Sequence, residues 1–276
     1  MKILVPCDFS KISNNAALYA AKFAKKVKAE IILFNVTHFK HPSNDQVGFE
    51  ENERDDLRFS EAARDCTHLA DKLKSTVKGV QISFEVVAGF PMESLIEDYA
   101  VHNKIDLIVM GTKGASGLQK ALFGSNAVNV INRNSIPVIT VPEYARFNNL
   151  KHIVFASDMI KIQPRIQKLI LLAQLFDASI YILHVLPQFP QDSDKKIDVV
   201  KIKNTLINKY KYKKISFHIS QNDDVVEAIN DFVADKKTDL LAMFTHDITF
   251  FENIFNTSVS RRMAFHSLVP LLTIKQ

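Results

Sequence analysis

The sequence has few residues of the kinds that cross-link a chain or anchor it in a membrane. Its 276 residues include two cysteines, seven glycines and no tryptophan. Two cysteines cannot build a disulfide framework, and so low a number suits a reducing compartment. No apolar run approaches the ~20 residues of a membrane span, and the first residues lack the apolar core of a signal peptide. We therefore predict a cytoplasmic protein that has no membrane partner.

The excess positive charge is confined to the second half of the chain. The net charge is +5, although residues 1–145 carry equal numbers of basic and acidic side chains. Many lysines lie between positions 195 and 214, where they alternate with apolar residues such as Ile202 and Leu206 at roughly helical spacing. A basic stretch can bind phosphate backbones, but this spacing favours the solvated face of a helix. We therefore predict no nucleic-acid partner.

Segments of the first half recur in the second half, in the same order. The matched pairs are MKILVPCDFS at 1–10 with KHIVFASDMI at 151–160, AEIILFNV at 29–36 with ASIYILHV at 178–185, IDLIVMGT at 105–112 with TDLLAMFT at 238–245, and SIPVITVP at 135–142 with SLVPLLTI at 267–274. A repeat of this length indicates two copies of one domain. The short polar stretch around 143–151 separates them, so we predict domains at 1–144 and 149–276.

Short apolar runs alternate with helical patterns within each copy. This alternation is typical of βαβ units and of a parallel sheet that is buried on both faces. The predicted fold class is α/β, with two tandem open-sheet, doubly wound (Rossmann-like) domains, each of five mostly parallel strands and four helices. The expected strands are 2–6, 30–36, 81–87, 105–110 and 137–141, then 152–156, 179–185, 214–219, 238–243 and 269–274. The first expected helix starts at Ser10 or Ser13. The other expected helices of the first copy span 55–77, 92–103 and 125–134, and those of the second copy span 163–176, 196–210, 224–236 and 257–266.

Two further expectations concern assembly and loops. The apolar last strands of the two copies would be exposed sheet edges, which need covering. We therefore expect the copies to pack as an intramolecular pseudo-two-fold dimer, and a further homodimer stays open. Residues 38–54 carry HPSND and several glutamates, which predicts an exposed loop.

Glycines and a helix start follow the fourth strand of the first copy. Gly111 and Gly114 come directly after the strand, and Gly124 and Ser125 open the next predicted helix. Glycine permits positive φ and a close approach of backbone to an anion, and a helix N-terminus presents unpaired amides and a favourable dipole. In an open α/β sheet, ligands bind at this edge. The sequence therefore predicts a cup of N–H donors for a polyphosphate.

The spacing Gly-x2-Gly-x9-Gly-Ser resembles the ATP-binding signature of the universal stress protein family. Two further features fit the resemblance, namely Pro6-Cys7-Asp8 at the end of the first strand and Pro137-Val138 before the last. The P-loop and GxGxxG patterns are both absent. The resemblance implies that ATP binds the first domain and that the protein serves stress adaptation. The residues that it implies for nucleotide binding are Pro6, Asp8, Val36, Met110, Gly111, Gly114, Gly124, Ser125 and Asn126.

The second copy departs from this signature. Phe244, Asp247 and Thr257 stand where the first copy has Gly111, Gly114 and Gly124, and Ser258 alone is kept. A phenylalanine would occupy the space for phosphate, and a carboxylate would repel a polyanion by on the order of 1 kcal/mol or more. We therefore predict one nucleotide per chain, bound in the first domain.

No residue pattern indicates catalysis or a metal site. Hydrolysis of ATP needs a base or a water-positioning group near the γ-phosphate, and 111–126 holds no convincing candidate. Mg²⁺ could accompany ATP, held by phosphate oxygens and water. We predict a regulatory ATP-binding protein with an unidentified protein partner and at most slow hydrolysis. The alternatives are a nucleotide-independent interaction or scaffold protein of the same fold, and an adenylyl-transferring hydrolase, whose glycine-serine loop after the first strand is missing.

Two other side chains are assigned structural roles. Cys7 alternates with Asp8 along the end of the first strand, so it would point away from the cleft and be buried and inert. His184 occupies the position of Asn35 in the repeat, and as a lone histidine on a strand it is expected to be structural rather than a ligand.

Overall fold

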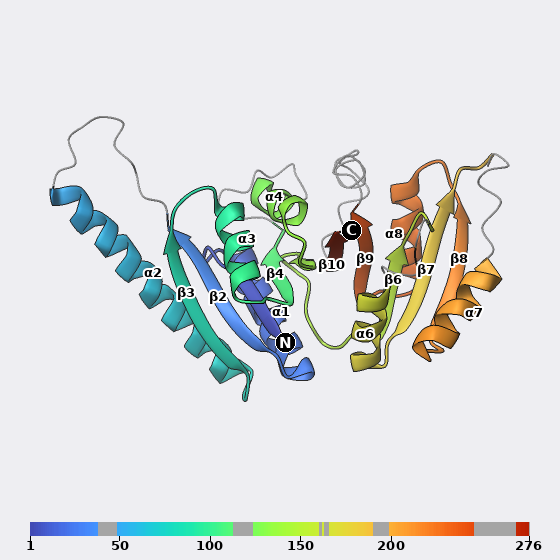
Figure 1. Cartoon of the computed structure of the whole chain (residues 1–276), viewed down its shortest axis with the longest axis horizontal. Helices are drawn as coiled ribbons and strands as arrows, with labels where there is room; N and C mark the ends of the chain where they lie inside the picture. Colours follow the sequence, from blue (N-terminus) through green and yellow to red (C-terminus); the bar gives the residue numbers. More distant parts are fainter. Residues whose placement is uncertain are drawn as a thin grey trace. The chain divides into compact units, whose positions relative to one another are not determined.

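The computed structural model describes residues 1–37, 49–112, 124–159, 162, 166–189, 199–245 and 269–275. Its internal contacts divide the chain into two compact units, the first ending at Phe147 and the second beginning at Asn148 (Figure 1). Each unit is an α/β domain of parallel strands and helices. None of the helices in these ranges combines the length and the apolar character needed to cross a membrane.

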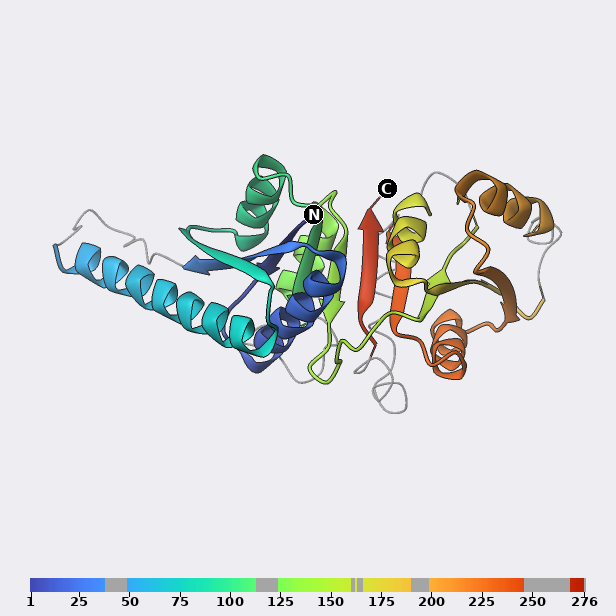
Figure 2. The ribbon, with the colours of Figure 1, turned by 90° about the horizontal axis from the view of Figure 1, so that it is seen from below.

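The first unit is a doubly wound parallel sheet. Its strands are β1 (Lys2–Pro6), β2 (Glu30–Thr37), β3 (Gln81–Ala88), β4 (Leu107–Gly111) and β5 (Val138–Val141), and its helices are α1 (Lys11–Val27), α2 (Phe49–Thr76), α3 (Met92–His102) and α4 (Ser125–Arg133). The strand order is β3-β2-β1-β4-β5, and the pairs are parallel. Figure 2 shows α1 and α2 on one face of the sheet and α3 on the other. Strands β2 and β3 lie on one side of β1, and β4 and β5 lie on the other. The point at which the strand order reverses is therefore between β1 and β4.

The second unit repeats this topology. Its strands are β6 (His152–Ala156), β7 (Ser179–Leu186), β8 (Ile215–Gln221), β9 (Leu240–Thr245) and β10 (Leu271–Lys275), and its helices are α6 (Gln167–Phe176), α7 (Val199–Tyr210) and α8 (Val225–Asp235). The order β10-β9-β6-β7-β8 is parallel throughout. The predicted fold class is confirmed. The helix expected at 257–266 lies outside the described residues.

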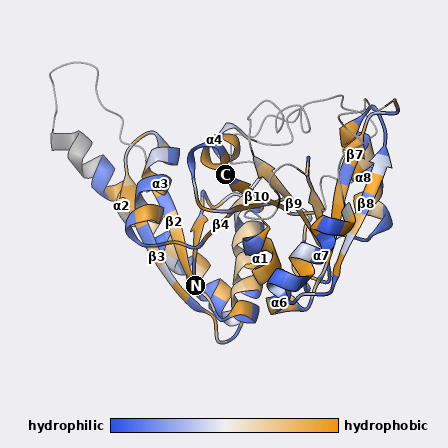
Figure 3. Ribbon diagram, turned by 45° about the vertical axis from the view of Figure 1, so that its right-hand side comes forward, coloured by the Kyte–Doolittle hydropathy of each residue, from blue (hydrophilic) through white to orange (hydrophobic). Residues whose placement is uncertain are grey.

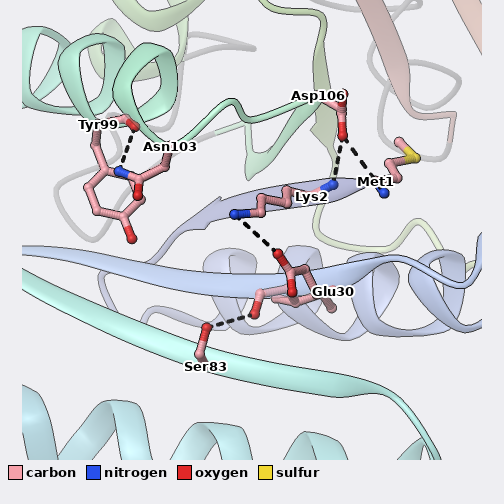
Figure 4. A network of polar contacts seen from close by, with 8 residues as sticks. Met1, Lys2, Glu30, Ser83, Tyr99, Asn103 and Asp106 are labelled. Carbon is pink, nitrogen blue, oxygen red and sulfur yellow. Dashed lines mark hydrogen bonds and ion pairs between the residues drawn. The ribbon is translucent and has the colours of Figure 1, made fainter.

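The repeat extends to individual hydrogen bonds. In the first unit the Asp106 carboxylate accepts from the backbone N–H of Lys2 at 2.8 Å, and the Lys2 ammonium lies 3.5 Å from Glu30 (Figure 4). In the second unit the Asp239 carboxylate accepts from the backbone N–H of His152 at 2.9 Å, at the same place in the fold. One aspartate thus fixes the start of the first strand in each copy.

Apolar residues fill the strands because both faces of each sheet are covered by helices (Figure 3). Ile3, Leu4 and Val5 of β1 are fully buried. Helix α1 starts next to Ser10, as predicted, and buries Ala20 and Phe23 against the sheet. Ser10 caps this helix, and its hydroxyl accepts from the Ser13 backbone N–H at 3.2 Å.

Helix α2 begins earlier than the sequence predicted. Residues 38–54 were expected to form a loop, and the helix was placed at 55–77, but α2 starts at Phe49. Glutamate has a high helix propensity, and acidic residues are favourable in the first turns, where the helix dipole is positive. The run of glutamates from Glu50 therefore extends the helix instead of interrupting it.

The lysine-rich segment forms a solvated helix face, as predicted. Lys201, Lys203 and Lys209 of α7 are exposed, and Leu206 is fully buried. Val200, near the start of the same helix, is 68% exposed.

The two cysteines meet inside the first unit. Cys7 is 6% exposed and Cys66 is fully buried, and both are free thiols. The Cys7 thiol donates to the Phe34 carbonyl at 3.7 Å. Interaction with the neighbouring Cys66 raises the pKa of Cys7, and burial raises it further. The same interaction lowers the pKa of Cys66. The prediction that Cys7 is buried is confirmed, and its thiol is held in the protonated form.

This burial predicts slow thiol chemistry. We expect neither cysteine to react with Ellman's reagent in the native protein within minutes, because reaction needs an accessible thiolate. Both should react at once in guanidinium chloride. The absorbance of released thionitrobenzoate measures the number of reactive thiols in the native and in the unfolded protein. Rapid reaction of either thiol in the native protein would contradict the burial of Cys7 and Cys66.

Candidate functional site

The start of α4 is tied to the end of β4. The backbone N–H of Gly124 donates to the carbonyl of Thr112 at 2.7 Å, and the N–H of Thr112 donates to Val141 of β5 at 3.3 Å. Thr112 is itself buried. These two bonds place the first turn of α4 at the carboxyl edge of the sheet. Sequence reasoning missed Thr112, although its position directly after Gly111 at a strand end was a usable signal.

The first turn of α4 presents amides that have no partner within the helix. Gly124 is the N-cap residue, with φ −74 and ψ 154, and no side chain caps the helix. The Gly124 carbonyl accepts from the N–H groups of Ala127 and Val128, which leaves the amides of Ser125 and Asn126 ahead of the hydrogen-bond ladder. Ser125 and Asn126 are exposed. Such a terminus is suited to an anion.

Of the two glycines predicted to approach a phosphate near the end of β4, the structure describes one. Gly111 is the last residue of the strand and pairs with Val141. Its backbone is extended, so the positive φ expected of it is not found. The chain turns only after this residue, and what glycine provides at position 111 is the absence of a Cβ. Gly114 lies outside the described residues.

Asp8 follows β1 and is exposed at the same edge of the sheet. One of its carboxylate oxygens, Oδ1, accepts from the backbone N–H of Ser10 at 3.1 Å. Its own N–H donates to the Ser13 hydroxyl at 3.2 Å. Between these contacts Phe9 has a positive φ of 61, which turns the chain sharply into α1. Asp8 therefore shapes the loop as well as placing a carboxylate at the cleft.

A buried asparagine joins β1 to β2 beside Asp8. The Asn35 side-chain amide donates to the carbonyl of Cys7 at 2.7 Å, and Asn35 is only 7% exposed. The repeat has the same contact, since His184 Nδ1 lies 2.9 Å from the carbonyl of Ser157. This geometry agrees with the structural role expected of His184. Sequence reasoning missed Asn35, because an isolated Asn in an apolar strand carries no motif.

The remaining residues implied by the resemblance lie on strands. Pro6 and Met110 are buried at the ends of β1 and β4, so only their main-chain atoms could meet a ligand. Val36 is half-buried near the end of β2. The structure thus brings Val36, Asp8 and Gly111 to the carboxyl ends of β2, β1 and β4 respectively, which are neighbours in the sheet.

The second unit has a phenylalanine at the position of Gly111. Phe244 pairs with Ile274 of β10, just as Gly111 pairs with Val141 of β5. Its ring packs edge-on against Phe155, with 4.8 Å between the centroids. Asp247, Thr257 and Ser258 lie outside the described residues. The register of β4 with β1 and of β9 with β6 makes Phe244 the equivalent of Gly111. It also matches Val138 with Leu271, so the sequence match of 135–142 with 267–274, which set Val138 against Pro270, is wrong by one residue.

The carboxyl edge of the first unit's sheet offers both hydrogen-bond donors and an acceptor. The amides of α4 can donate to phosphate oxygens, and Asp8 supplies an acceptor on the adjoining strand. In the part of the chain that the structure describes, no group of three or more His, Cys, Asp or Glu side chains is placed to hold a metal ion. A parallel sheet of this order defines a Rossmann-like α/β domain, and the order occurs in both units. In the first unit the N-terminus of α4 lies at the point where the strand order reverses.

Comparison with known proteins identifies the family. The model of the Universal stress protein family matches residues 1–142 and again 149–275. The chain therefore belongs to the universal stress protein family and is a tandem member of it. Universal stress protein MJ0531 of Methanocaldococcus jannaschii is 33% identical over 142 residues, which cover 51% of this chain and 81% of the relative.

Solved structures show the same fold over the whole chain. A universal stress protein from Archaeoglobus fulgidus superimposes with a TM-score of 0.72 and covers 99% of this chain and 98% of its own, at 17% identity. A universal stress protein from Pseudomonas aeruginosa gives a TM-score of 0.61 at 15% identity, covering 99% and 92%. At these identities the likeness concerns the tandem fold alone.

Proposed function

We propose that the protein is a regulatory protein that binds one ATP per chain, in the cleft of the first unit. The observation that carries the proposal is the hydrogen bond from Gly124 to Thr112, because it holds the open N-terminus of α4 beside the end of β4. Phosphate oxygens would accept from the amides of Ser125 and Asn126, and Gly111 leaves room for them. Asp8 and Val36 would face the nucleoside.

Phe244 supports a proposal that leaves the second unit without this role. Its ring stands at the equivalent of Gly111 and is packed against Phe155. A phosphate there would have to displace an aromatic side chain from its contact. The proposal therefore includes a stoichiometry of one nucleotide per chain.

Mg²⁺ would accompany the nucleotide without a protein cage of its own. The described carboxylate at this edge is Asp8, and one of its oxygens already accepts from Ser10. Phosphate oxygens and water would supply most of the ligands, as is common for this ion. We propose no catalytic residue, and ATP would act by changing the affinity for a protein partner.

Calorimetric titration of the full chain with ATP and Mg²⁺ tests the proposal. We expect saturable binding with a stoichiometry of one. Absence of heat at millimolar nucleotide would overturn it and favour the nucleotide-independent scaffold. A stoichiometry of two would overturn the exclusion of the second unit.

Changing Asp8 separates its role in the loop from its role in binding. We expect Asp8→Ala to weaken ATP binding by about tenfold to a hundredfold, because hydrogen bonds to charged groups contribute roughly 1.5–3 kcal/mol. Asp8→Asn keeps an acceptor for the Ser10 amide, so any loss that remains reports contact with the ligand. Titration calorimetry measures both variants.

The matched control for this experiment is Asp158→Asn, which changes the equivalent residue of the second unit. Asp158 follows β6 as Asp8 follows β1, and both are exposed. We expect no change in ATP affinity for this control. Equal losses from Asp8→Asn and Asp158→Asn would contradict the assignment of the site to the first unit.

A further inference from the structure

A cavity of about 350 Å³ opens at the carboxyl edge of the second unit's sheet. This volume lies at the lower end of the ~300–1,000 Å³ that small-molecule sites occupy. Its apolar walls come from the strands and from α8, and they are formed by Leu183, Val185, Val225, Ile229 and Phe244. The cavity therefore offers a mostly apolar enclosure with an aromatic ring on one side.

The polar groups in the wall include two acceptors, a carboxylate and an imidazole nitrogen, and one hydroxyl. Ser157, Asp158 and His184 line the cavity. His184 Nδ1 is occupied by the Ser157 carbonyl at 2.9 Å, so in the neutral ring Nε2 is left as an acceptor. The Ser157 hydroxyl accepts from the Met159 backbone N–H at 3.0 Å. A carboxylate and an imidazole nitrogen together select a ligand that donates hydrogen bonds.

The same groups disfavour an anion. Asp158 adds negative charge at the wall, and the described residues that line the cavity include no lysine or arginine to neutralise a phosphate. Phe244 also replaces the glycine that leaves room for phosphate in the first unit. The cavity thus differs in chemistry from the proposed ATP site, although the two occupy the same place in the repeat.

We propose that this cavity is a second ligand site, specific for small uncharged aromatic heterocycles that carry an N–H donor and no phosphate. The flat ring would lie against Phe244 and between the aliphatic side chains of β7 and α8. Its N–H would donate to His184 Nε2 or to the Asp158 carboxylate. The chain would then bind two ligands of different chemistry, one in each unit.

Indole is a suitable probe, and benzofuran is its matched control. The two rings have nearly the same shape, but benzofuran has an oxygen where indole has the N–H. Because the protein contains no tryptophan, indole fluorescence reports its own environment directly. We expect a saturable blue shift of indole emission with the full chain, and at least tenfold weaker binding of benzofuran in competition.

Two variants locate the binding. Val225→Phe places a ring in the cavity and is expected to weaken indole binding at least tenfold, whereas Val200→Phe, at an exposed position of α7, should leave it unchanged.

His184→Asn tests the acceptor in the cavity wall. It copies Asn35 of the first unit, which keeps the hydrogen bond to the Ser157 carbonyl and removes Nε2. We expect this variant to lose the preference for indole over benzofuran while thermal unfolding stays unchanged.

Saturating ATP in the same titration separates this proposal from the proposed function. Indole should bind equally with and without ATP, and it should bind even if ATP does not. No saturable indole binding, equal binding by Val225→Phe, or displacement of indole by ATP would each overturn the second site. Equal affinity for benzofuran would overturn its selectivity for N–H donors.

Discussion

Gly124→Asp is expected to reduce ATP binding by at least tenfold while the fold is retained. The new carboxylate would stand at the N-cap of α4, where it can accept from the same amides that we propose for phosphate. It would also set a negative charge beside a polyanion. Each tenfold loss corresponds to about 1.4 kcal/mol, which is within reach of one repulsive contact that is partly shielded from water.

The backbone conformation at Gly124 allows this substitution without a loss of stability. Its φ of −74 and ψ of 154 are accessible to any residue, and aspartate is a preferred N-cap. We therefore expect the free energy of unfolding to stay the same or to rise by a few tenths of a kcal/mol. Gly124→Asn supplies an uncharged side chain of the same shape, so the difference in ATP affinity between the two variants isolates the charge. Wild-type affinity in Gly124→Asp would exclude the N-terminus of α4 from the site.

Phe155→Ala is expected to destabilise the second unit by roughly 3–5 kcal/mol, the usual cost of removing a large buried aromatic side chain. Phe155 is 1% exposed and lies in β6. Its ring meets Phe244 edge-on at 4.8 Å, an arrangement that adds to simple burial. Truncation would leave a void beneath Phe244.

Denaturant unfolding of the full chain measures this loss. Phe189→Ala is the control, because Phe189 belongs to the same unit and is 89% exposed. We expect the control to change stability by less than about 0.5 kcal/mol. A loss below ~1 kcal/mol in Phe155→Ala would contradict the packing of β6 against β9.

Much of the fold could be predicted because its signals are local. Parallel strands buried on both faces appear as short apolar runs, and β1 and β6 were located to the residue in this way. The repeat then indicated that both copies have the same fold, and the order of the strands in the sheet came from the structure. The error at α2 has a local cause too, because glutamates suit both a loop and the first turns of a helix.

Individual site contacts were less predictable. The spaced glycines indicated a phosphate cup, but the bond from Gly124 to Thr112 joins residues whose proximity depends on where the chain between them returns. Asn35 was missed because its carbonyl partner, Cys7, is distant in sequence. Polar contacts of this kind follow from strand register, which no single residue reveals.

The sequence by itself determined that the chain is a duplicated α/β domain, and that only the first copy keeps the spaced glycines. Apolar periodicity and a repeat are properties of neighbouring residues, so they can be read without coordinates. The tertiary structure alone decided that Asn35 of β2 donates to the Cys7 carbonyl and that the Phe244 ring packs against Phe155. It also decided that Phe244, His184 and Asp158 enclose a cavity. The physical reason is that each of these depends on side chains brought together from separate strands and helices, where packing, not sequence distance, sets the neighbours.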